Sequence, residues 1–186
     1  MIKIDDENPW KTHSDKTVYE NPWIKVVENQ VTNPNGGRGI YGVVHFQHIA
    51  IGVIPVDEED HTWLVGQYRY AQNRFEWEIP EGGGKPDVDP VESARRELRE
   101  ETGILAKDFE LILTDFQTSN SVCNEVGQIF IARDLTHHAP EPEETEQLFV
   151  KRLPLTDAFE MVHRGEIRDS MSVAGLLKLE VRMLRG

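Results

Sequence analysis

The sequence lacks the features of several classes of protein. Its 186 residues contain one cysteine, Cys123, which excludes an internal disulfide bond and fits a reducing compartment. No apolar run reaches the length of about 18 residues that a membrane-spanning helix needs. The first residues also lack the basic and apolar regions of a signal peptide. We therefore expect a cytoplasmic protein with no membrane segment.

Basic residues are scarce as well. The chain has 20 lysines and arginines against 33 acidic residues, so its formal net charge is −13. A field of that sign repels nucleic acid, and no basic stripe in the sequence offsets it. The same field repels a phosphate substrate, so an acidic protein that handles phosphates needs a metal ion between carboxylate and phosphate oxygens.

A short helix is expected over residues 90–102, directly after a glycine-rich loop. Asp89 suits the N-cap, because its carboxylate accepts hydrogen bonds from the free amides of the first turn. Pro90 suits the first helical position, where no amide hydrogen is needed. Gly103 suits the left-handed position that ends a helix.

Three carboxylates crowd one side of this helix. At about 100° per residue, Glu97, Glu100 and Glu101 fall within an arc of roughly 100° beside the apolar stripe. Like charges at this spacing repel, and a divalent cation with oxygen ligands would relieve the repulsion. The alternative is a solvated helix whose acids pair with its arginines. Arg96 suits pairing with Glu92 and Glu100, which leaves Glu97 and Glu101 without an obvious arginine.

The rest of the chain indicates an α/β fold. Helices are expected over residues 155–164 and 170–185, and strands over 17–31 (broken at Asn21-Pro22), 39–46, 49–55, 62–70, 75–80, 109–116, 127–132 and 148–153. This pattern predicts an α/β sandwich with a mixed sheet over residues 48–186. Residues 1–47 are expected to form a small antiparallel β unit, which has little core of its own.

The spacing of residues 82–104 resembles the signature of the Nudix hydrolases, Gly-x5-Glu-x7-Arg-Glu-U-x-Glu-Glu-x-Gly-U, in which U is a bulky apolar residue. The matching positions are Gly82, Arg96-Glu97-Leu98, Glu100-Glu101, Gly103 and Ile104. The first signature glutamate is replaced by Val88, and Asp87 or Asp89 could substitute for it. The resemblance implies the Nudix α/β/α sandwich.

The resemblance also implies a metal site for magnesium or manganese. It assigns the metal to Glu97, Glu100 and Glu101, with the backbone carbonyl of Glu81 as a further ligand. Many relatives have alanine at this last position, so the Glu81 side chain is an additional acid with no assigned role. Arg96 is either a phosphate contact or a brace for the glycine loop, and we favour the brace.

Other stretches resemble the branch of the family that splits nucleotide sugars, the ADP-ribose pyrophosphatases and related nucleoside-diphosphate-sugar hydrolases. They are the N-terminal antiparallel unit, Gln67-Tyr68-Arg69, the run 77–82 and the tail 165–176. The branch implies cleavage to a nucleoside monophosphate and a sugar phosphate. ADP-ribose is the first expected substrate, and GDP-mannose or another sugar nucleotide is the next. A homodimer that exchanges its N-terminal units is also implied.

The resemblance names further site residues. The general base is Glu144 or Glu146, which the sequence does not separate. We expect Arg69 to contact the diphosphate or the ribose, and Glu125 to face the terminal sugar.

The run 77–82 adds Glu78 as a substrate contact, and Trp23 is expected to stack on the nucleobase. The alternatives are an exposed surface arginine at Arg69, an acidic surface loop at residues 143–146, and a hydrophobic anchor at Trp23.

Two other functions remain open. A Nudix enzyme that removes unwanted nucleoside triphosphates is one, although the extended N-terminal unit argues against it. A Nudix-fold module that binds a nucleotide sugar without cleaving it is the other. Val88 is its only support, and a pure binder has no need of the mutually repelling Glu97, Glu100 and Glu101.

Overall fold

The computed structural model describes residues 7–139 and 147–185. Its contacts divide the chain into two compact units. Unit 1 is Met1–Gln47 with Ser119–Glu125, and unit 2 is His48–Thr118 with Val126–Gly186. The loop 119–125, which the sequence analysis placed within the main domain, therefore belongs with unit 1.

Unit 1 is a three-stranded antiparallel sheet in the order β1-β2-β3, formed by β1 (Lys11–Glu20), β2 (Ile24–Thr32) and β3 (Arg38–Phe46). The break expected at Asn21-Pro22 is a turn in which the Asn21 side chain accepts from the amides of Trp23 and Ile24, at 2.9 and 2.8 Å. The loop 119–125 attaches to β3, because the Tyr41 hydroxyl donates to the Ser121 carbonyl at 2.6 Å. The first strand begins six residues before the expected start at residue 17, since pairing with β2 orders a stretch that has no periodic signal of its own.

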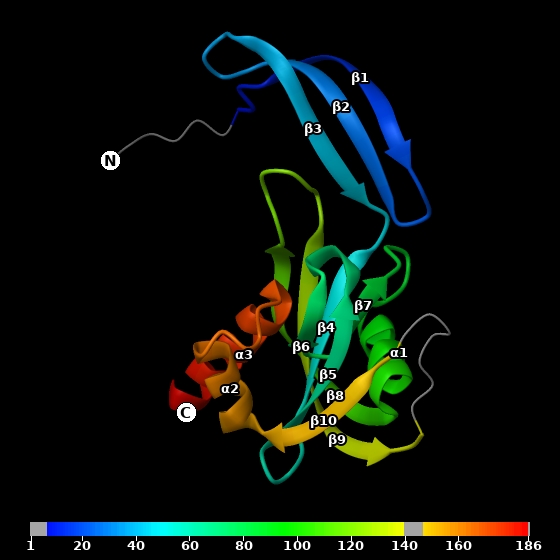
Figure 1. Cartoon of the computed structure of the whole chain (residues 1–186), viewed down its shortest axis with the longest axis vertical. Coiled ribbons are helices and arrows are strands. Elements are labelled where there is room, and N and C mark those ends of the chain that lie inside the picture. The colour runs from blue at the N-terminus through cyan, green and yellow to red at the C-terminus, as the bar shows by residue number, and fades with distance from the viewer. Residues whose placement is uncertain (1–6, 140–146, 186) are drawn as a thin grey trace. The chain divides into compact units, whose positions relative to one another are not determined.

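Unit 2 contains two sheets (Figure 1). The larger has the order β7-β4-β9-β8 and consists of β7 (Glu81–Gly84), β4 (Ile49–Pro55), β9 (Val126–His137) and β8 (Ile104–Gln117). Strands β4 and β9 are parallel and the other pairs are antiparallel, which confirms the predicted mixed sheet. The smaller sheet is antiparallel in the order β10-β5-β6, with β10 (Phe149–Pro154), β5 (His61–Arg69) and β6 (Arg74–Glu78). A short 3-10 helix, η1 (Tyr70–Gln72), links β5 to β6.

Helices cover both faces of the larger sheet, as Figure 1 shows: α1 (Pro90–Thr102) lies on one face and α3 (Ser170–Arg185) on the other, while α2 (Leu155–His163) packs against α3 and the smaller sheet. Each face has its own core. Ala94 and Leu98 of α1 are fully buried against Ile51 of β4, whereas Leu176 of α3 packs with Ile54 of the same strand. Burying a leucine side chain contributes about 1.5–3 kcal/mol. These layers confirm the predicted sandwich.

The glycine-rich stretch is a strand rather than the expected loop. Residues Glu81–Gly84 pair antiparallel with β4, in the register Ile49↔Gly84 to Gly52↔Glu81. A Cβ at Gly84 would come within 2.9 Å of Ile51 and 3.1 Å of Ile49, so the strand approaches β4 too closely for a side chain there. This strand presents its backbone to α1.

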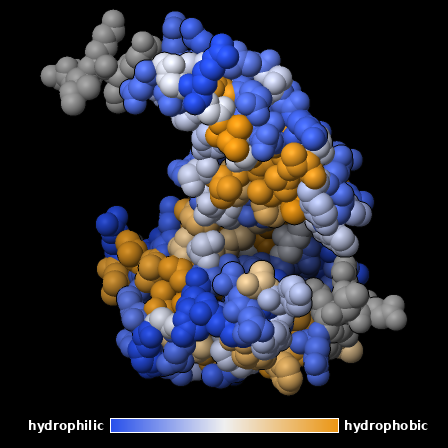
Figure 2. All heavy atoms as spheres, turned by 45° about the horizontal axis from the view of Figure 1, so that its top comes forward, coloured by the Kyte–Doolittle hydropathy of each residue, from blue (hydrophilic) through white to orange (hydrophobic). Residues whose placement is uncertain are grey.

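Within the described residues, no helix is long and apolar enough to cross a membrane. Figure 2 shows hydrophobic residues exposed in separate groups on a largely hydrophilic surface. Those of unit 1 include Val18, Ile40 and Phe46, and those of unit 2 include Phe75 and Phe149.

Candidate active site

Helix α1 has the ends that the sequence predicts. Asp89 accepts a hydrogen bond from the amide of Val91 at 2.9 Å, and Pro90 is the first helical residue. Gly103 has a φ of +72° and donates to the Arg99 carbonyl at 2.8 Å. With both ends fixed, the helix presents its acidic residues toward strand β7.

The acids of α1 are not equally exposed. Glu97 and Glu101 are buried, with 8% and 4% of their surface exposed, whereas Glu100 is half-buried. Glu101 accepts a hydrogen bond from the backbone amide of Glu81 at 3.1 Å. A buried carboxylate is costly without compensating partners, and a backbone amide is one such partner.

Glu97 lies directly against Gly82. A Cβ added at Gly82 would overlap the Glu97 carboxylate, so glycine is the residue that leaves room for it. The backbone φ of Gly82 is not among the positive values in the chain, so the requirement is space rather than conformation. The first position of the signature is thus glycine because any side chain there would displace the Glu97 carboxylate.

Arg96 connects the helix to β7. Its Nη2 atom donates to the Gly83 carbonyl at 2.9 Å and to Glu97 at 2.5 Å, and its Nη1 atom donates to Glu100 at 2.7 Å. Partial burial acts to lower the pKa of Arg96, but the charges of Glu97 and Glu100 raise it above its usual value. These are the contacts of a structural brace.

One of the two expected ion pairs is therefore wrong, and one pair that was not expected is present. Glu97 does have an arginine partner, because the long Arg96 side chain bends toward the neighbouring residue. Glu92 lies 3.7 Å from Arg95 rather than pairing with Arg96, whose guanidinium is already engaged. The expected pair of Arg96 with Glu100 is present.

The donor set on α1 fits a divalent metal ion. Hard cations take carboxylate and carbonyl oxygens. Glu97 and Glu101 lie against the backbone of residues 81 and 82 at the start of β7, and Arg96 links Glu100 to the Gly83 carbonyl. Among the described residues, three ligand side chains come within 4.8 Å of one another at a different place, Asp57, Glu59 and His61. There Arg152 already holds both carboxylates, at 2.6 and 2.7 Å, so that group is an ion-pair network.

A second set of charges lies around Glu81, at the start of β7. Arg69 donates from Nε to Glu78 at 3.1 Å and from Nη2 to Glu81 at 2.9 Å, and its Nη2 atom also forms an ion pair with Glu78 at 2.8 Å. Burial acts to lower the pKa of Arg69, but the two carboxylates raise it. In the part of the chain that is described, no partner is recorded for Nη1, which leaves that edge for a ligand.

The Glu81 side chain has an unusual environment. Its Oε2 atom is buried and, among the residues that the structure describes, has no hydrogen-bond partner. Burial, and then the neighbouring carboxylates of Asp169 and Glu78, raise the pKa of Glu81 well above its usual value. Burial also raises the pKa of Glu78, against the opposing effect of Arg69.

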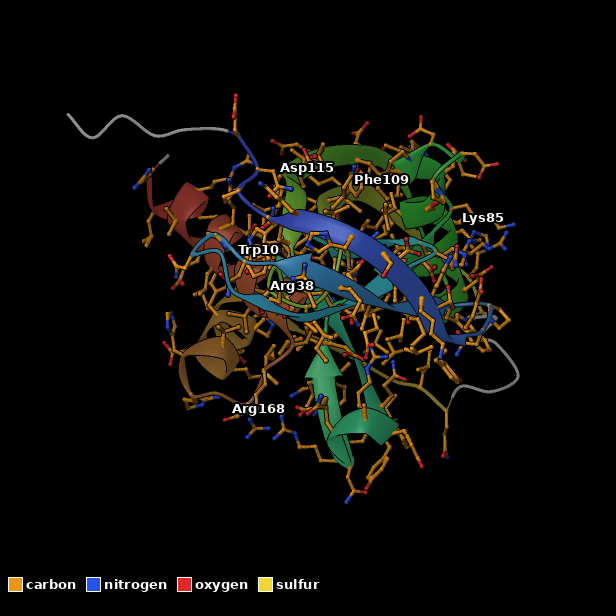
Figure 3. All side chains as sticks on the ribbon, turned by 90° about the horizontal axis from the view of Figure 1, so that it is seen from above. Trp10, Arg38, Lys85, Phe109, Asp115 and Arg168 are labelled. Carbon is orange, nitrogen blue, oxygen red and sulfur yellow. The ribbon has the colours of Figure 1, made fainter. Side chains whose placement is uncertain are left out.

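A cavity of about 600 Å³ opens beside these residues. Its lining combines the acids above with Arg74 and Arg168 and with the η1 segment. Arg168, labelled in Figure 3, approaches Glu76 at 3.4 Å. The cavity thus places arginines and carboxylates side by side, as binding of a phosphorylated sugar would require.

The remaining predicted residues fall elsewhere. Glu144 and Glu146 lie outside the described residues. Trp23, 67% exposed, and Glu125, half-buried, belong to unit 1. Their roles at a site on unit 2 stay predictions.

Sequence reasoning did not identify Asp169 or Ser172 as neighbours of the site. The tail 165–176 resembles the family branch in sequence, but the resemblance assigns no role to its members. Their contacts with residues 79–81 span about 90 positions of sequence. No local pattern could reveal such a pairing.

The fold and the acid-bearing helix define a pyrophosphohydrolase of the α/β/α sandwich type. The chain belongs to the NUDIX family: the model of the NUDIX domain matches residues 46–172. A second model, the nucleoside diphosphate sugar hydrolase N-terminal domain, matches residues 10–44. Members of this family generally use divalent metals.

Individual proteins are similar along nearly the whole chain. An ADP-ribose pyrophosphatase of Mycobacterium tuberculosis is 32% identical over 178 residues, which cover 92% of this chain and 83% of that protein. An ADP-ribose pyrophosphatase of Bacillus subtilis is 29% identical over 174 residues, which cover 92% and 93%. The crystal structure of an ADP compounds hydrolase matches the fold with a TM-score of 0.84 at 22% identity, over 97% of both chains.

Proposed function

We propose that this chain hydrolyses the pyrophosphate bond of a nucleoside diphosphate sugar, with ADP-ribose as the first substrate and GDP-mannose or another sugar nucleotide next. The products are a nucleoside monophosphate and a sugar phosphate. The observation that carries the proposal is the pair of buried acids, Glu97 and Glu101, held against the backbone of Gly82 and Glu81. The names of the two similar pyrophosphatases support the choice of ADP-ribose.

The metal in this proposal is Mg²⁺ or Mn²⁺. Glu97, Glu100 and Glu101 would hold it together with the Glu81 carbonyl. When bound, the ion neutralises charge on the bridging phosphates and polarises water. Arg96 keeps the acids and β7 in register, because it contacts Gly83, Glu97 and Glu100 at once.

The proposed substrate contacts lie next to the metal site, around Arg69. Among the described residues the Nη1 atom of Arg69 has no partner and is open to the diphosphate, and Glu78 orients the guanidinium through one hydrogen bond from Nε and an ion pair at Nη2. Gln67 in turn donates to Glu78 at 2.9 Å. An arginine positioned in this way loses little freedom when it binds a phosphate.

The proposal has further parts. Glu144 or Glu146 takes the proton from the attacking water. Trp23 stacks on the base, and Glu125 faces the terminal sugar. The chain acts as a homodimer in the cytoplasm, assembled through unit 1.

A turnover screen tests the reaction. Purified protein is incubated with ADP-ribose, GDP-mannose, UDP-glucose and nucleoside triphosphates, with magnesium or manganese, and products are separated by ion-exchange chromatography. Nucleoside monophosphate released from a sugar nucleotide supports the proposal. Inorganic pyrophosphate released from triphosphates alone would show the alternative triphosphatase. Tight calorimetric binding of ADP-ribose without turnover would show a sensor.

A further inference from the structure

The connection between β6 and β7 is held by three different elements of unit 2. The Ile79 amide donates to the Ser172 hydroxyl of α3 at 2.9 Å. The Pro80 carbonyl accepts from the Val53 amide of β4 at 2.8 Å. The Glu81 amide donates to Glu101 of α1 at 3.1 Å. Three consecutive residues, 79–81, thus form backbone hydrogen bonds to α3, β4 and α1 in turn.

The start of α3 is built to hold this connection. Ser172 is completely buried, and its own amide donates to the Asp169 carboxylate at 2.7 Å, which caps the helix. The preceding Met171 packs with Ile79 over Gly52, where a Cβ would meet the two side chains at 3.1 and 2.9 Å. Ile79 is therefore held by α3 through both its backbone and its side chain.

Ile79 needs this partner because of its place in the chain. It lies between the end of β6 at Glu78 and the start of β7 at Glu81, so neither strand supplies an acceptor for its amide. Pro80, which follows, has no amide to continue a ladder. The Ser172 hydroxyl is the acceptor that the structure provides for this buried donor.

We propose that Ser172 is a positioning residue for the metal site. By holding the Ile79 amide, it sets the path of residues 79–81, and the Glu81 amide then orients the Glu101 carboxylate. Within the described residues, the hydrogen bonds of Ser172 join it to the Ile79 amide and, through its own amide, to Asp169. The inference rests on the proposed metal role of Glu101, and it assigns to the tail 165–176 a part in metal binding.

The variants are chosen to separate positioning from general stability. Ser172→Ala removes the acceptor and leaves the Ile79 amide buried without a partner. Ser172→Thr keeps the hydroxyl. Leu179→Val weakens the packing of the same helix in the core, because Leu179 is 3% exposed, and it removes none of the hydrogen bonds of residues 79–81.

The main measurement is Mn²⁺ binding to the full-length protein by isothermal titration calorimetry, at a temperature where every variant is folded by circular dichroism. We expect Ser172→Ala to bind Mn²⁺ about 10-fold to 100-fold more weakly, which is the usual effect of losing a group that orients a metal ligand. Ser172→Thr should recover most of the affinity, and Leu179→Val should bind like the wild type. Wild-type affinity in folded Ser172→Ala would overturn the proposal, as would an equal loss in Leu179→Val.

Kinetics give a second readout. In turnover of ADP-ribose, Ser172→Ala should need more Mg²⁺ for half-maximal rate, with little change in KM at saturating Mg²⁺. If Ser172→Thr does not fold, comparing Ser172→Ala with Leu179→Val in both assays still distinguishes a positioning role from a general loss of stability. If the wild type hydrolyses no nucleotide sugar yet binds Mn²⁺, the proposed function fails while the calorimetry still tests the role of Ser172.

Discussion

The carboxylate of Glu97 occupies the space that a side chain at Gly82 would fill. The contact is with the far end of a flexible side chain, so the fold can accommodate an added methyl group by moving Glu97. A substitution there should therefore affect the chemistry of the site more than the stability of the fold.

Gly82→Ala should lower kcat by at least about 100-fold, because it displaces one of the two buried acids, while the free energy of unfolding changes by less than about 1 kcal/mol. Gly83→Ala is the matched control, since a Cβ there would lie at an ordinary 3.4 Å from His48. Steady-state kinetics and urea unfolding check the pair. Equal activity of the two variants would refute the argument.

Glu101→Gln should nearly abolish turnover and keep the fold. The side-chain carbonyl of the introduced glutamine can still accept from the Glu81 amide, so the hydrogen bond survives while the negative charge is lost. Removing one of several like charges should leave the free energy of unfolding unchanged or raised by a few tenths of a kcal/mol. The control is Glu92→Gln, whose side chain is 62% exposed on the same helix. Undiminished turnover by Glu101→Gln at saturating magnesium would sink the enzyme assignment.

Arg96→Ala should destabilise the metal-free protein by about 1–3 kcal/mol, because it removes charged hydrogen bonds to Gly83, Glu97 and Glu100. Arg99→Ala should cost less than about 0.5 kcal/mol, since Arg99 approaches Glu100 only to 3.8 Å. Chemical unfolding in the presence of EDTA measures both. Arg96→Lys should restore little, because an ammonium cannot span three acceptors as a guanidinium does. Equal decreases in the free energy of unfolding of the two alanine variants would show that the contacts of Arg96 do not stabilise the fold.

Glu81 gives a prediction about pH. The folded state keeps the Glu81 proton to a higher pH than the unfolded chain, because burial and nearby carboxylates raise its pKa above the ordinary 4.5. The wild-type free energy of unfolding should therefore fall as the pH rises above about 4.5, until the folded-state pKa is passed. Glu81→Gln keeps an acceptor for Arg69 and carries no charge, so it should be the more stable protein at pH 7.

Urea unfolding between pH 4 and 8, with EDTA present, tests this difference. Each unit of pKa shift corresponds to about 1.4 kcal/mol, and part of the slope should persist through Glu78, whose pKa burial also raises. Glu160→Gln, at an exposed position of α2, is the control and should follow the wild type. A Glu81→Gln curve parallel to the wild type would mean that Glu81 is ionised in the fold.

Local signals explain what the sequence predicts well. Asp89, Pro90 and Gly103 act within one turn of the helix ends, so α1 is confirmed at both limits. The limits of the strands depend less on local sequence, because pairing with a neighbouring strand sets them. The expected strand 109–116 is the longer β8, Ile104–Gln117, because pairing with β9 extends it mainly toward its N-terminal end.

At the site, too, local features are predicted from the sequence and contacts between distant residues are not. The acids of α1 follow from helical spacing, and the sequence predicts them together. The contacts that orient them do not follow from spacing. The brace to Gly83 requires the pairing of β7 with β4, and the Ser172 hydrogen bond spans 93 residues. Such contacts depend on the assembled sheet, which no single stretch of sequence encodes.

The loop 119–125 limits how the chain can be truncated. It hydrogen-bonds to β3, while the strands that flank it belong to unit 2. The polypeptide thus passes between the two units at three points in its length. Deleting residues up to Gln47 would strip the β8–β9 hairpin tip of its partners, including the Tyr41 hydroxyl. A minimal catalytic fragment would need that tip replaced by a short turn.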